Sequence, residues 1–295
     1  MKRIRHLLIL SLTYFIFNAS ISAEHHGGGA HIQSTEVAPG IYMLHGVGGF
    51  TGGNIGVSIG DDGVVMIDDS MPPFLDQLNE QLASITDQPI EFLINTHVHG
   101  DHTGNNAAMA ETGAHIVSHE RLRSRLKTDP EFPKSGLPVI TFTEEMSFHL
   151  NNQPARLVHT PHAHTDGDSI IVFTAANVIH TGDVFFHRLF PFIDLDSGGS
   201  VDGFIAAQER VLALANKSTK IIPGHGPLGS KKDLQRDLAM LKDARQLVAG
   251  MIAADHDLDA ILEANPLAKY HDDYNWGFIT TERMTRTLYR DIAGD

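Results

Sequence analysis

Residues 96–102 of this chain read Thr96-His97-Val98-His99-Gly100-Asp101-His102. They contain three imidazoles and one carboxylate within six residues, and all four side chains are types that bind metal ions. In extended backbone, side chains two residues apart point the same way, so His97 and His99 can bind one ion. Asp101 and His102 follow at once and can reach a second ion. The alternative is a solvated polar loop, which the clustering of ligand types makes the weaker interpretation.

Three later stretches of the chain also contain candidate ligands. Each of them, like the first stretch, adjoins an apolar run that is typical of a buried strand. Phe92–Ile94 directly precedes the first stretch and predicts a rigid support for it. The three later stretches read Pro161-His162-Ala163-His164-Thr165-Asp166-Gly167-Asp168-Ser169, His180-Thr181-Gly182-Asp183-Val184-Phe185 and Ile222-Pro223-Gly224-His225-Gly226-Pro227. Taken singly, each is compatible with an ordinary turn. Because all four adjoin predicted strands, their combination predicts one shared site.

The rest of the chain alternates short strand patterns with helical ones. Apolar residues recur at helical spacing over Pro72–Ile85, and Asp202 is expected to cap a further helix. Ser230 and Asp233 have the spacing of a capping box that opens a long helix. A final helix is expected from about Thr281 to Ile292. This mixture favours an α/β sandwich with helices outside its sheets.

The four motifs, in this order, resemble those of the metallo-β-lactamase superfamily, and the resemblance spans roughly Ile41 to Pro227. It implies a four-layer αββα sandwich with a dinuclear metal site, usually zinc, at one sheet edge. It also implies three ligands for the first ion, three for the second and one bridging carboxylate. In that order, the matching residues are His97, His99 and His164; Asp101, His102 and His225; and Asp183. Asp68, after the predicted strand Val64–Ile67, is expected to support the ligand loop.

Two histidines compete for one ligand position. The family pattern places the ligand directly before Thr-x-Gly, and His164 fits this pattern. His162 is therefore expected to lie at the rim or to support a ligand. Other histidines have no motif support and are expected to be structural or solvated, namely His45, His115, His119, His149, His159 and His180.

The implied ligand set suggests a mechanism. All ligands are imidazoles or carboxylates, which suit two Zn²⁺ ions and also admit iron or manganese. Three protein ligands on the first ion leave a coordination position open. Two ions roughly 3.5–4 Å apart can share a water and lower its pKa from about 15.7 toward about 7. We expect the metal-bridging hydroxide to attack a carbonyl group, with the catalytic Asp101 orienting or transferring the proton.

The substrate remains open between a β-lactam, a lactone and a thioester. Lactamases with a cysteine ligand carry cysteine at the position of Asp183 and lysine three residues later, where this chain has Phe186. A bridging aspartate resembles the thioesterase, lactonase and phosphodiesterase branches. However, the glycine- and cysteine-containing stretch that glyoxalase-type thioesterases carry after it is absent.

The N-terminus of the chain has the pattern of a secretory signal, which predicts export. Export makes β-lactamase-like amide hydrolysis the leading interpretation, because cell-wall antibiotics are met outside the cytoplasm. A lactonase or a glyoxalase II-like thioesterase on the same site is the alternative. An iron-dependent oxidoreductase and a non-catalytic metal-binding protein are two further interpretations.

Three residues are candidate substrate contacts. Phe50 lies in the glycine-rich stretch Gly46–Asn54, which is either a mobile flap over an apolar substrate or a plain hairpin tip. His187 and Arg188 could bind a substrate carboxylate in place of the missing lysine. The apolar stretch Phe185–Ile193 is expected to be core rather than pocket wall.

The composition limits location and partners. The chain has 295 residues, no cysteine and a formal net charge of −14. The charge argues against a nucleic-acid partner, because binding to phosphates depends on Lys and Arg. The absence of cysteine excludes disulfides and thiolate metal ligands. A small molecule with a carbonyl group is the expected partner.

The N-terminus is typical of a secretory signal. Lys2, Arg3 and Arg5 precede an apolar run, Leu7–Phe17, which is shorter than the ~20 residues that span a bilayer, and small residues lead to Ala23. We therefore expect a periplasmic or secreted protein with no membrane anchor after cleavage. The expected segments are 1–23 as signal peptide, 24–35 as flexible His/Gly leader and 36–295 as one metallo-β-lactamase-fold domain with C-terminal helices.

Overall fold

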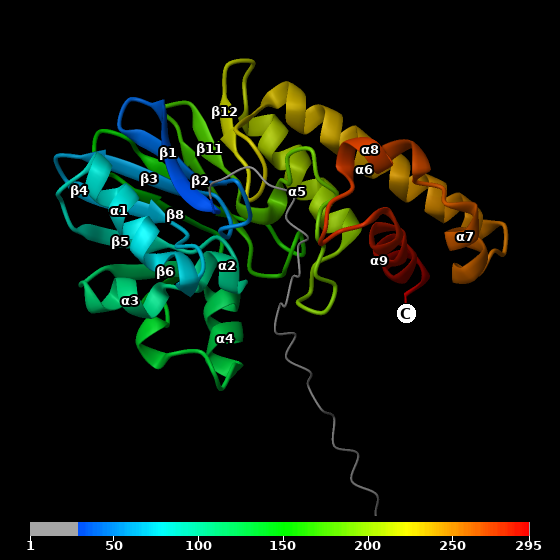
Figure 1. Cartoon of the computed structure of the whole chain (residues 1–295), viewed down its shortest axis with the longest axis horizontal. Coiled ribbons are helices and arrows are strands. Elements are labelled where there is room, and N and C mark those ends of the chain that lie inside the picture. The colour runs from blue at the N-terminus through cyan, green and yellow to red at the C-terminus, as the bar shows by residue number, and fades with distance from the viewer. Residues whose placement is uncertain (1–28, 295) are drawn as a thin grey trace, which may run out of the picture.

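Two β-sheets face each other in the half of the molecule that lies to the left in Figure 1. The computed structural model describes residues 29–294. The first sheet runs in chain order through β1 (His31–Ala38), β2 (Ile41–Val47), β3 (Ile55–Gly60), β4 (Gly63–Ile67), β5 (Ile90–Ile94), β6 (His115–His119) and β7 (Ile140–Phe142). The second is ordered β13-β12-β11-β10-β9-β8, with β8 (Glu145–Phe148), β9 (Ala155–His159), β10 (Ser169–Phe173), β11 (Val178–His180), β12 (Lys220–Ile222) and β13 (Gly229–Ser230).

Strand β4 shows how the first sheet is buried on both faces. Val65 and Ile67 point into the core between the sheets, where they join Leu157 of the second sheet. Val64 and Met66 alternate with them and pack on the opposite face, under the helices. The period of two along a strand produces this alternation. Strands β4 to β7 pair in parallel, so their carboxyl ends meet at one edge.

Helices cover the outer face of each sheet. Leu78 and Met109, from α1 and α3, pack on the first sheet, and Ala207 and Val211 from α5 pack on the second. The helices are α1 (Leu75–Ile85), α2 (Gly100–Thr103), α3 (Asn106–Glu111), α4 (Glu120–Thr128), α5 (Val201–Leu214), α6 (Lys231–Ala253), α7 (Leu258–Ala264), α8 (His271–Tyr274) and α9 (Thr281–Ala293). Short 3₁₀ turns are η1 (Pro72–Phe74), η2 (Lys134–Gly136), η3 (Gly182–Val184) and η4 (Ala268–Tyr270). The predicted αββα order is confirmed.

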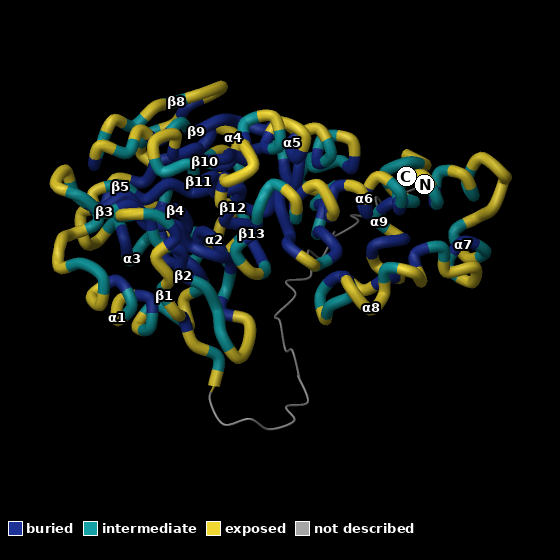
Figure 2. The backbone as a smooth tube through the Cα atoms, turned by 90° about the horizontal axis from the view of Figure 1, so that it is seen from above, coloured by how far each residue is buried: buried dark blue, intermediate teal, exposed yellow. Residues whose placement is uncertain are grey.

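The C-terminal helices form a second apolar core at one end of the molecule (Figure 2). Leu241 and Val248 of α6 pack with Leu288 of α9. The same core includes Phe186 and Phe190, which follow Asp183 in the chain. The C-terminal helices therefore pack against the segment that continues from the predicted bridging aspartate.

Two local expectations need correction. Residues 31–35, expected in a flexible leader, lie in β1, because Ile32 is buried and its backbone N–H donates to Gln77 of α1. The helix cap expected at Asp202 is Ser200, whose hydroxyl accepts the N–H of Gly203. Asp202 instead lies in the first turn. The capping box at Ser230 is present.

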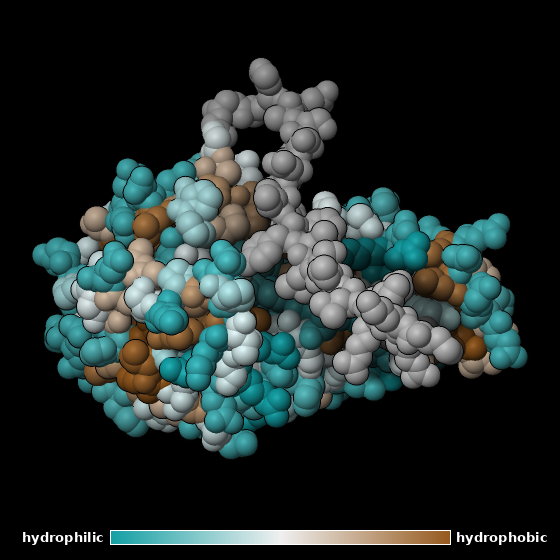
Figure 3. Space-filling view, turned by 90° about the horizontal axis from the view of Figure 1, so that it is seen from below, coloured by the Kyte–Doolittle hydropathy of each residue, from teal (hydrophilic) through white to brown (hydrophobic). Residues whose placement is uncertain are grey.

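Apolar regions that could contact a membrane would lie on the surface of the molecule or in long apolar helices. The face in Figure 3 is mostly hydrophilic, with smaller apolar areas between. Within residues 29–294, no helix has the length and apolar character needed to cross a membrane. The predicted signal peptide and the first part of the leader lie outside the described residues.

Two stacked histidines link the sheets. His119 ends β6 and His159 ends β9, and their rings stack with centroids 3.7 Å apart and planes 6° apart. His119 Nε2 donates to the Thr143 carbonyl at 2.7 Å, and His159 Nδ1 donates to the Asp168 carbonyl at 2.9 Å. Burial lowers the pKa of both rings below the ordinary value. The stack is therefore a contact between neutral rings.

Acid should weaken this contact. As pH falls from about 7.5 to about 5.5, the unfolded chain takes up protons at histidines with an ordinary pKa of about 6.5, whereas the folded stack resists protonation, so stability falls. His159→Phe retains a stacked ring but removes one titrating group, so it should lose less stability over this range than the wild type. Urea unfolding at both pH values, with a chelator present, measures the free energy of unfolding of the wild type and of His159→Phe. Replacing the exposed His149 by Gln is the control, and equal losses in the wild type and His159→Phe would contradict the explanation.

Candidate metal centre

Asp68 organises the histidine-rich stretch. It follows β4 with a φ of 61° and is fully buried. Its Oδ1 accepts the backbone N–H of Thr96 at 2.7 Å, and its Oδ2 accepts the Thr96 hydroxyl at 2.7 Å. His102 Nδ1 donates to the same Oδ2 at 2.7 Å. One buried carboxylate therefore positions the start of this stretch and orients the ring at its end.

The first cluster of candidate ligands joins three segments of the chain. One ligand atom from each of four residues lies within 4.8 Å of the others, and these residues are His97, His99, His164 and Asp183. His164 belongs to this cluster, as predicted. His162 is exposed, and its Nδ1 donates to the Gly198 carbonyl at 2.9 Å. It therefore lies at the rim.

The second cluster lies beside the first. Its ligand atoms come from Asp101, His102 and His225, again within 4.8 Å of one another. His102 Nε2 is 3.1 Å from Asp183 Oδ1, and His225 Nε2 is 3.3 Å from Asp183 Oδ2. His164 Nε2, from the first cluster, is 3.5 Å from the same Oδ2. The carboxylate of Asp183 therefore lies between the two clusters.

Buried atoms without hydrogen-bond partners show that the site fits metal ions. His97 Nε2, His102 Nε2 and Asp183 Oδ1 are all buried and unsatisfied among the described residues. Leaving such groups unpaired costs about 1–3 kcal/mol each. All three atoms belong to the clusters, and imidazole nitrogen and carboxylate oxygen are donors for divalent cations. The donor set could therefore hold two ions.

The pKa shifts divide the histidines into two groups. Burial lowers the pKa of His164 to about 4, so its ring is neutral and offers a lone pair. Burial also opposes charge on His225, but the carboxylates of Asp183 and Asp101 outweigh it and raise its pKa to about 9. Burial favours the neutral form of Asp183, but the neighbouring histidines, His225 first, hold its pKa well below the ordinary value. The negative field that retains a proton on His225 also attracts a cation, so the two compete.

Two glycines allow the close approach of these side chains. A Cβ at Gly53 would lie 2.1 Å from the His102 ring, and one at Gly224 would lie 1.9 Å from Asp183 Oδ1. Asn54 fixes this part of the loop, since its side chain donates to the carbonyls of Pro223 and Gly226 at 2.9 Å each. The glycine-rich stretch is therefore anchored at its end to the turn that carries His225.

The segment 192–199 supports the first cluster and was missed by the sequence analysis. His99 Nε2 donates to Asp194 Oδ2 at 2.9 Å, which turns its Nδ1 toward His164 Nε2, 2.8 Å away. His164 Nδ1 donates to the Phe192 carbonyl at 2.7 Å. Asp194 is held by the backbone N–H of Ser197 at 3.0 Å. No local pattern reveals a partner 95 residues away.

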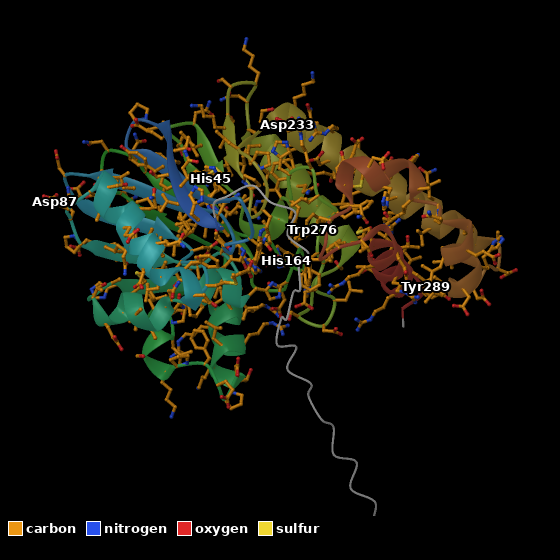
Figure 4. The ribbon with its side chains drawn as sticks, in the orientation of Figure 1. His45, Asp87, His164, Asp233, Trp276 and Tyr289 are labelled. Carbon is orange, nitrogen blue, oxygen red and sulfur yellow. The ribbon has the colours of Figure 1, made fainter. Side chains whose placement is uncertain are left out.

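Aromatic rings border both clusters. Phe50 is 44% exposed and stacks on His225, with ring centroids 5.7 Å apart. Phe192 stacks on His99 at 5.5 Å, and Trp276 lies 6.2 Å from His225. Figure 4 labels Trp276 and His164, which lie near each other where the sheets meet the C-terminal helices. The segment Phe185–Ile193 is mostly buried, as predicted. Arg188 is exposed and Leu189 and Phe192 are half-buried, and of these Phe192 contacts a candidate ligand.

The other two candidate substrate contacts are engaged elsewhere. His187 is buried, and its Nδ1 donates to the Pro227 carbonyl at 2.8 Å. Its Nε2 faces Asp233 of α6 at 3.7 Å. The backbone N–H of Arg188 donates to Asp237 at 3.0 Å. These contacts engage the His187 side chain with the turn after His225 and with α6. The backbone N–H of His187 also donates to the carbonyl of the candidate ligand His225 at 2.9 Å, so His187 supports the second cluster through its backbone.

Sequence comparison agrees with the fold and the clusters. A family model described as the metallo-β-lactamase superfamily matches residues 48–225, which include all seven candidate ligands. The chain belongs to the metallo-β-lactamase superfamily. The matched region carries the two His/Asp clusters, which fits a metal-binding member of this superfamily.

The curated relatives that the chain matches are named as hydrolases. The chain is 29% identical over 136 residues to a hydroxyacylglutathione hydrolase from Nitrosococcus oceani, covering 45% of this chain and 47% of that protein. It is 26% identical over 182 residues to a probable metallo-hydrolase from Methanocaldococcus jannaschii, covering 57% and 84%. The chain thus spans about half the length of the first relative.

Solved structures share the fold. A metallo-β-lactamase from Pontibacter korlensis has a TM-score of 0.62 and 18% identity, covering 72% of this chain and all of that one. The DIM-1 metallo-β-lactamase has a TM-score of 0.60 and 14% identity, covering 72% and 98%. At these identities the likeness concerns the αββα architecture.

Asp194→Asn should weaken metal binding. The neutral amide is a poorer acceptor for the His99 N–H, so we expect affinity for Zn²⁺ to fall roughly tenfold. Fluorescence of Trp276, the single tryptophan of the chain, can follow a Zn²⁺ titration. Asp196→Asn is the matched control, because Asp196 pairs with Arg290 at the surface. Unchanged affinity in Asp194→Asn would contradict a supporting role for this carboxylate.

Proposed function

We propose that this chain is a dinuclear zinc hydrolase that acts on a carbonyl substrate, with a thioester as the first candidate. The observation that carries the proposal is the position of Asp183. Its Oδ1 lies 3.1 Å from His102 and its Oδ2 lies 3.5 Å from His164, so one carboxylate faces both clusters. Such a carboxylate could be shared by two ions bound side by side, and a pair of ions can activate water for hydrolysis.

The residues divide into two ligand sets. His97, His99 and His164 would hold the first ion, and Asp183 would be shared between both. The second ion would be held by Asp101, His102 and His225. Nitrogen and oxygen donors without sulfur support zinc, with iron or manganese as the other metals that such donors accept. When bound, the zinc pair would supply a nucleophile from water at neutral pH and polarise the carbonyl oxygen.

Asp101 is the residue best placed to move the proton. Its side chain is 22% exposed, and its Oδ2 lies 3.3 Å from His225 Nε2. Burial disfavours its charge, but His102 and His225 outweigh this effect and lower its pKa to about 2. It is therefore an ionised acceptor at neutral pH. In thioester hydrolysis, the oxygen of water bonds to the carbonyl carbon, the C–S bond breaks, and a proton passes to the departing sulfur.

Two features support a thioester. The bridging carboxylate resembles that of the thioesterase and lactonase branches, and curated relatives are named hydroxyacylglutathione hydrolases. The second candidate is a β-lactam. It is supported by the exposed Phe50 beside His225, which could cover an apolar substrate, and by the predicted export.

A substrate panel tests the proposal. We expect a thioester to be hydrolysed when Zn²⁺ is present, and the activity to disappear with a chelator and return when Zn²⁺ is added back. A lactone and the β-lactam nitrocefin are the comparison substrates, and preference for nitrocefin would favour the second candidate. Metal analysis of the purified protein separates zinc from iron. Hydrolysis of none of the three with two zinc ions bound would contradict the proposal.

Asp101→Asn tests the proton-transfer role. Loss of the acceptor should lower kcat by roughly 100-fold or more, with an unchanged far-UV circular dichroism spectrum. Measuring zinc content alongside kcat shows whether the second ion has also been lost. Asp76→Asn, on the exposed side of α1, is the control and should keep wild-type kcat. Undiminished turnover in Asp101→Asn would count against this mechanism.

Export is a separate part of the proposal. It is supported by the sequence pattern of residues 1–23 alone. Expression in a bacterial host followed by fractionation and N-terminal sequencing tests it. A mature chain that begins after Ala23 in the periplasm or the medium is the expected result.

A further inference from the structure

Aromatic side chains from three distant segments meet beside the candidate metal centre. Phe50 comes from the glycine-rich loop, Phe192 from the segment after Asp183, and Trp276 and Phe278 from the segment before α9. Phe192 stacks on His99 at 5.5 Å and meets Phe278 edge-on at 5.2 Å. Trp276 contacts Phe278 at 5.6 Å. Phe192, Trp276 and Phe278 therefore form a continuous aromatic wall that begins at a candidate ligand.

Arg283 of α9 lies at the outer end of the aromatic wall. Its guanidinium carbon is 4.1 Å from the centroid of the Phe278 ring and 5.3 Å from that of Phe192. One of its nitrogens, Nη1, donates to the Phe278 carbonyl at 2.9 Å. Stacking occupies the flat face of the guanidinium and leaves N–H donors at its edge, in the fork geometry that matches a carboxylate.

The charge environment makes this arginine unusual. The chain carries a net charge of −14, and the neighbouring arginines of α9 pair with carboxylates: Arg286 with Glu282 at 2.8 Å, and Arg290 with Asp196. The charge of Asp194 acts on Arg283 from a distance, but among residues 29–294 no carboxylate forms an ion pair with Arg283 within 4.0 Å. In an acidic protein, an exposed arginine held in place by two rings and left without an acidic partner is suited to bind an anion.

We propose that Arg283 binds a carboxylate of the substrate while the aromatic wall binds the apolar part that precedes it. The substrate class is a thioester whose acyl part has a flat apolar body ending in a carboxylate. This inference rests on the proposed hydrolysis at the metal centre. Phe192 sets the geometry, because it touches a candidate ligand on one side and the guanidinium on the other.

A purely structural role is the competing explanation. The bond from Arg283 to the Phe278 carbonyl could simply fasten residues 276–278 to α9. That role would affect all substrates equally, whereas an anion site distinguishes a charged substrate from a neutral one of the same shape. The test therefore compares two matched substrates in the same variants.

The kinetic test uses two thioesters of N-acetylcysteamine. One carries the 4-carboxyphenylacetyl group, and the other carries its 4-carbamoyl analogue, which has the same shape without the charge. For Arg283→Met we expect KM for the charged substrate to rise about tenfold or more with little change in kcat, and KM for the neutral one to stay within about twofold. Arg283→Lys should recover part of the lost affinity for the charged substrate, because lysine restores the positive charge but not the paired N–H donors of the guanidinium.

Arg286→Met is the matched control. It removes a cation one turn away that is paired with Glu282 and has no contact with the wall, so both substrates should behave as in the wild type. An equal rise in KM for both thioesters in Arg283→Met, or no rise for either, would overturn the proposal.

A binding measurement separates this proposal from the proposed function. Trp276 is part of the wall and is the single tryptophan of the chain, so its fluorescence reports occupancy without catalysis. We expect 4-carboxyphenylacetate to bind zinc-loaded wild type at least about tenfold more tightly than 4-carbamoylphenylacetate, and Arg283→Met to remove this preference. If neither thioester is hydrolysed but this preference is present, the hydrolytic function fails and the anion site stands. Equal affinity of both acids for the wild type overturns the site.

Discussion

The buried carboxylate of Asp183 is the constraint around which the centre is arranged. A charged oxygen in a water-poor interior is tolerated only with opposite charge or donors around it. Here the imidazoles of His97, His102, His164 and His225 all lie within 3.7 Å of its oxygens. These four rings come from three segments that lie far apart in the sequence, around residues 97–102, 164 and 225. Their convergence on one carboxylate therefore requires the two sheets to stack in a single relative position.

Asp68 is a second buried carboxylate that must be surrounded by donors, and it lies on the opposite side of His102. By accepting three hydrogen bonds it satisfies its own charge and fixes the ring of His102, so the other ring nitrogen must face Asp183. The left-handed backbone of Asp68, with φ at 61°, is the local cost of this placement. Gly53 and Gly224 complete the arrangement, because any side chain there would occupy the space of a ligand. The glycines that look like turn residues in the sequence are thus required by packing against the site.

The sequence predicts the chemistry of this protein better than its specificity, and the reason is physical. Candidate ligands lie next to strand ends, and the apolar pattern of the sequence locates these ends. His225, for example, is predicted at the site because it follows the strand that ends at Ile222. Asp194 and Phe192 lie in irregular backbone, where neither period nor motif indicates a partner. Their roles depend on how the segment after Asp183 folds back over His99 and His164, which only tertiary packing determines. The start of β1 was missed for a related reason, because its burial comes from α1 and not from its own weak apolar pattern.

Part of the proposed substrate site lies outside the region that the family model matches. The family match ends at residue 225, whereas Trp276, Phe278 and Arg283 follow it. These residues are nevertheless fixed relative to the centre. Trp276 Nε1 donates to the Phe190 carbonyl at 2.9 Å, and Phe190 in turn donates its backbone N–H to the Tyr274 carbonyl at 2.8 Å.

These two bonds fasten the segment before α9 to the segment that continues from Asp183. Tyr274 is held from its other end as well, since its hydroxyl donates to Asp237 of α6 at 2.9 Å. A substitution in the C-terminal helices can therefore move Trp276 and Phe278. It can also reach the first cluster, because Phe192 of the same wall stacks on His99 and its carbonyl accepts a hydrogen bond from His164. The names of relatives aligned over the sheets therefore bear on the reaction at the metal centre, whereas the residues after position 225 complete the site proposed for the rest of the substrate.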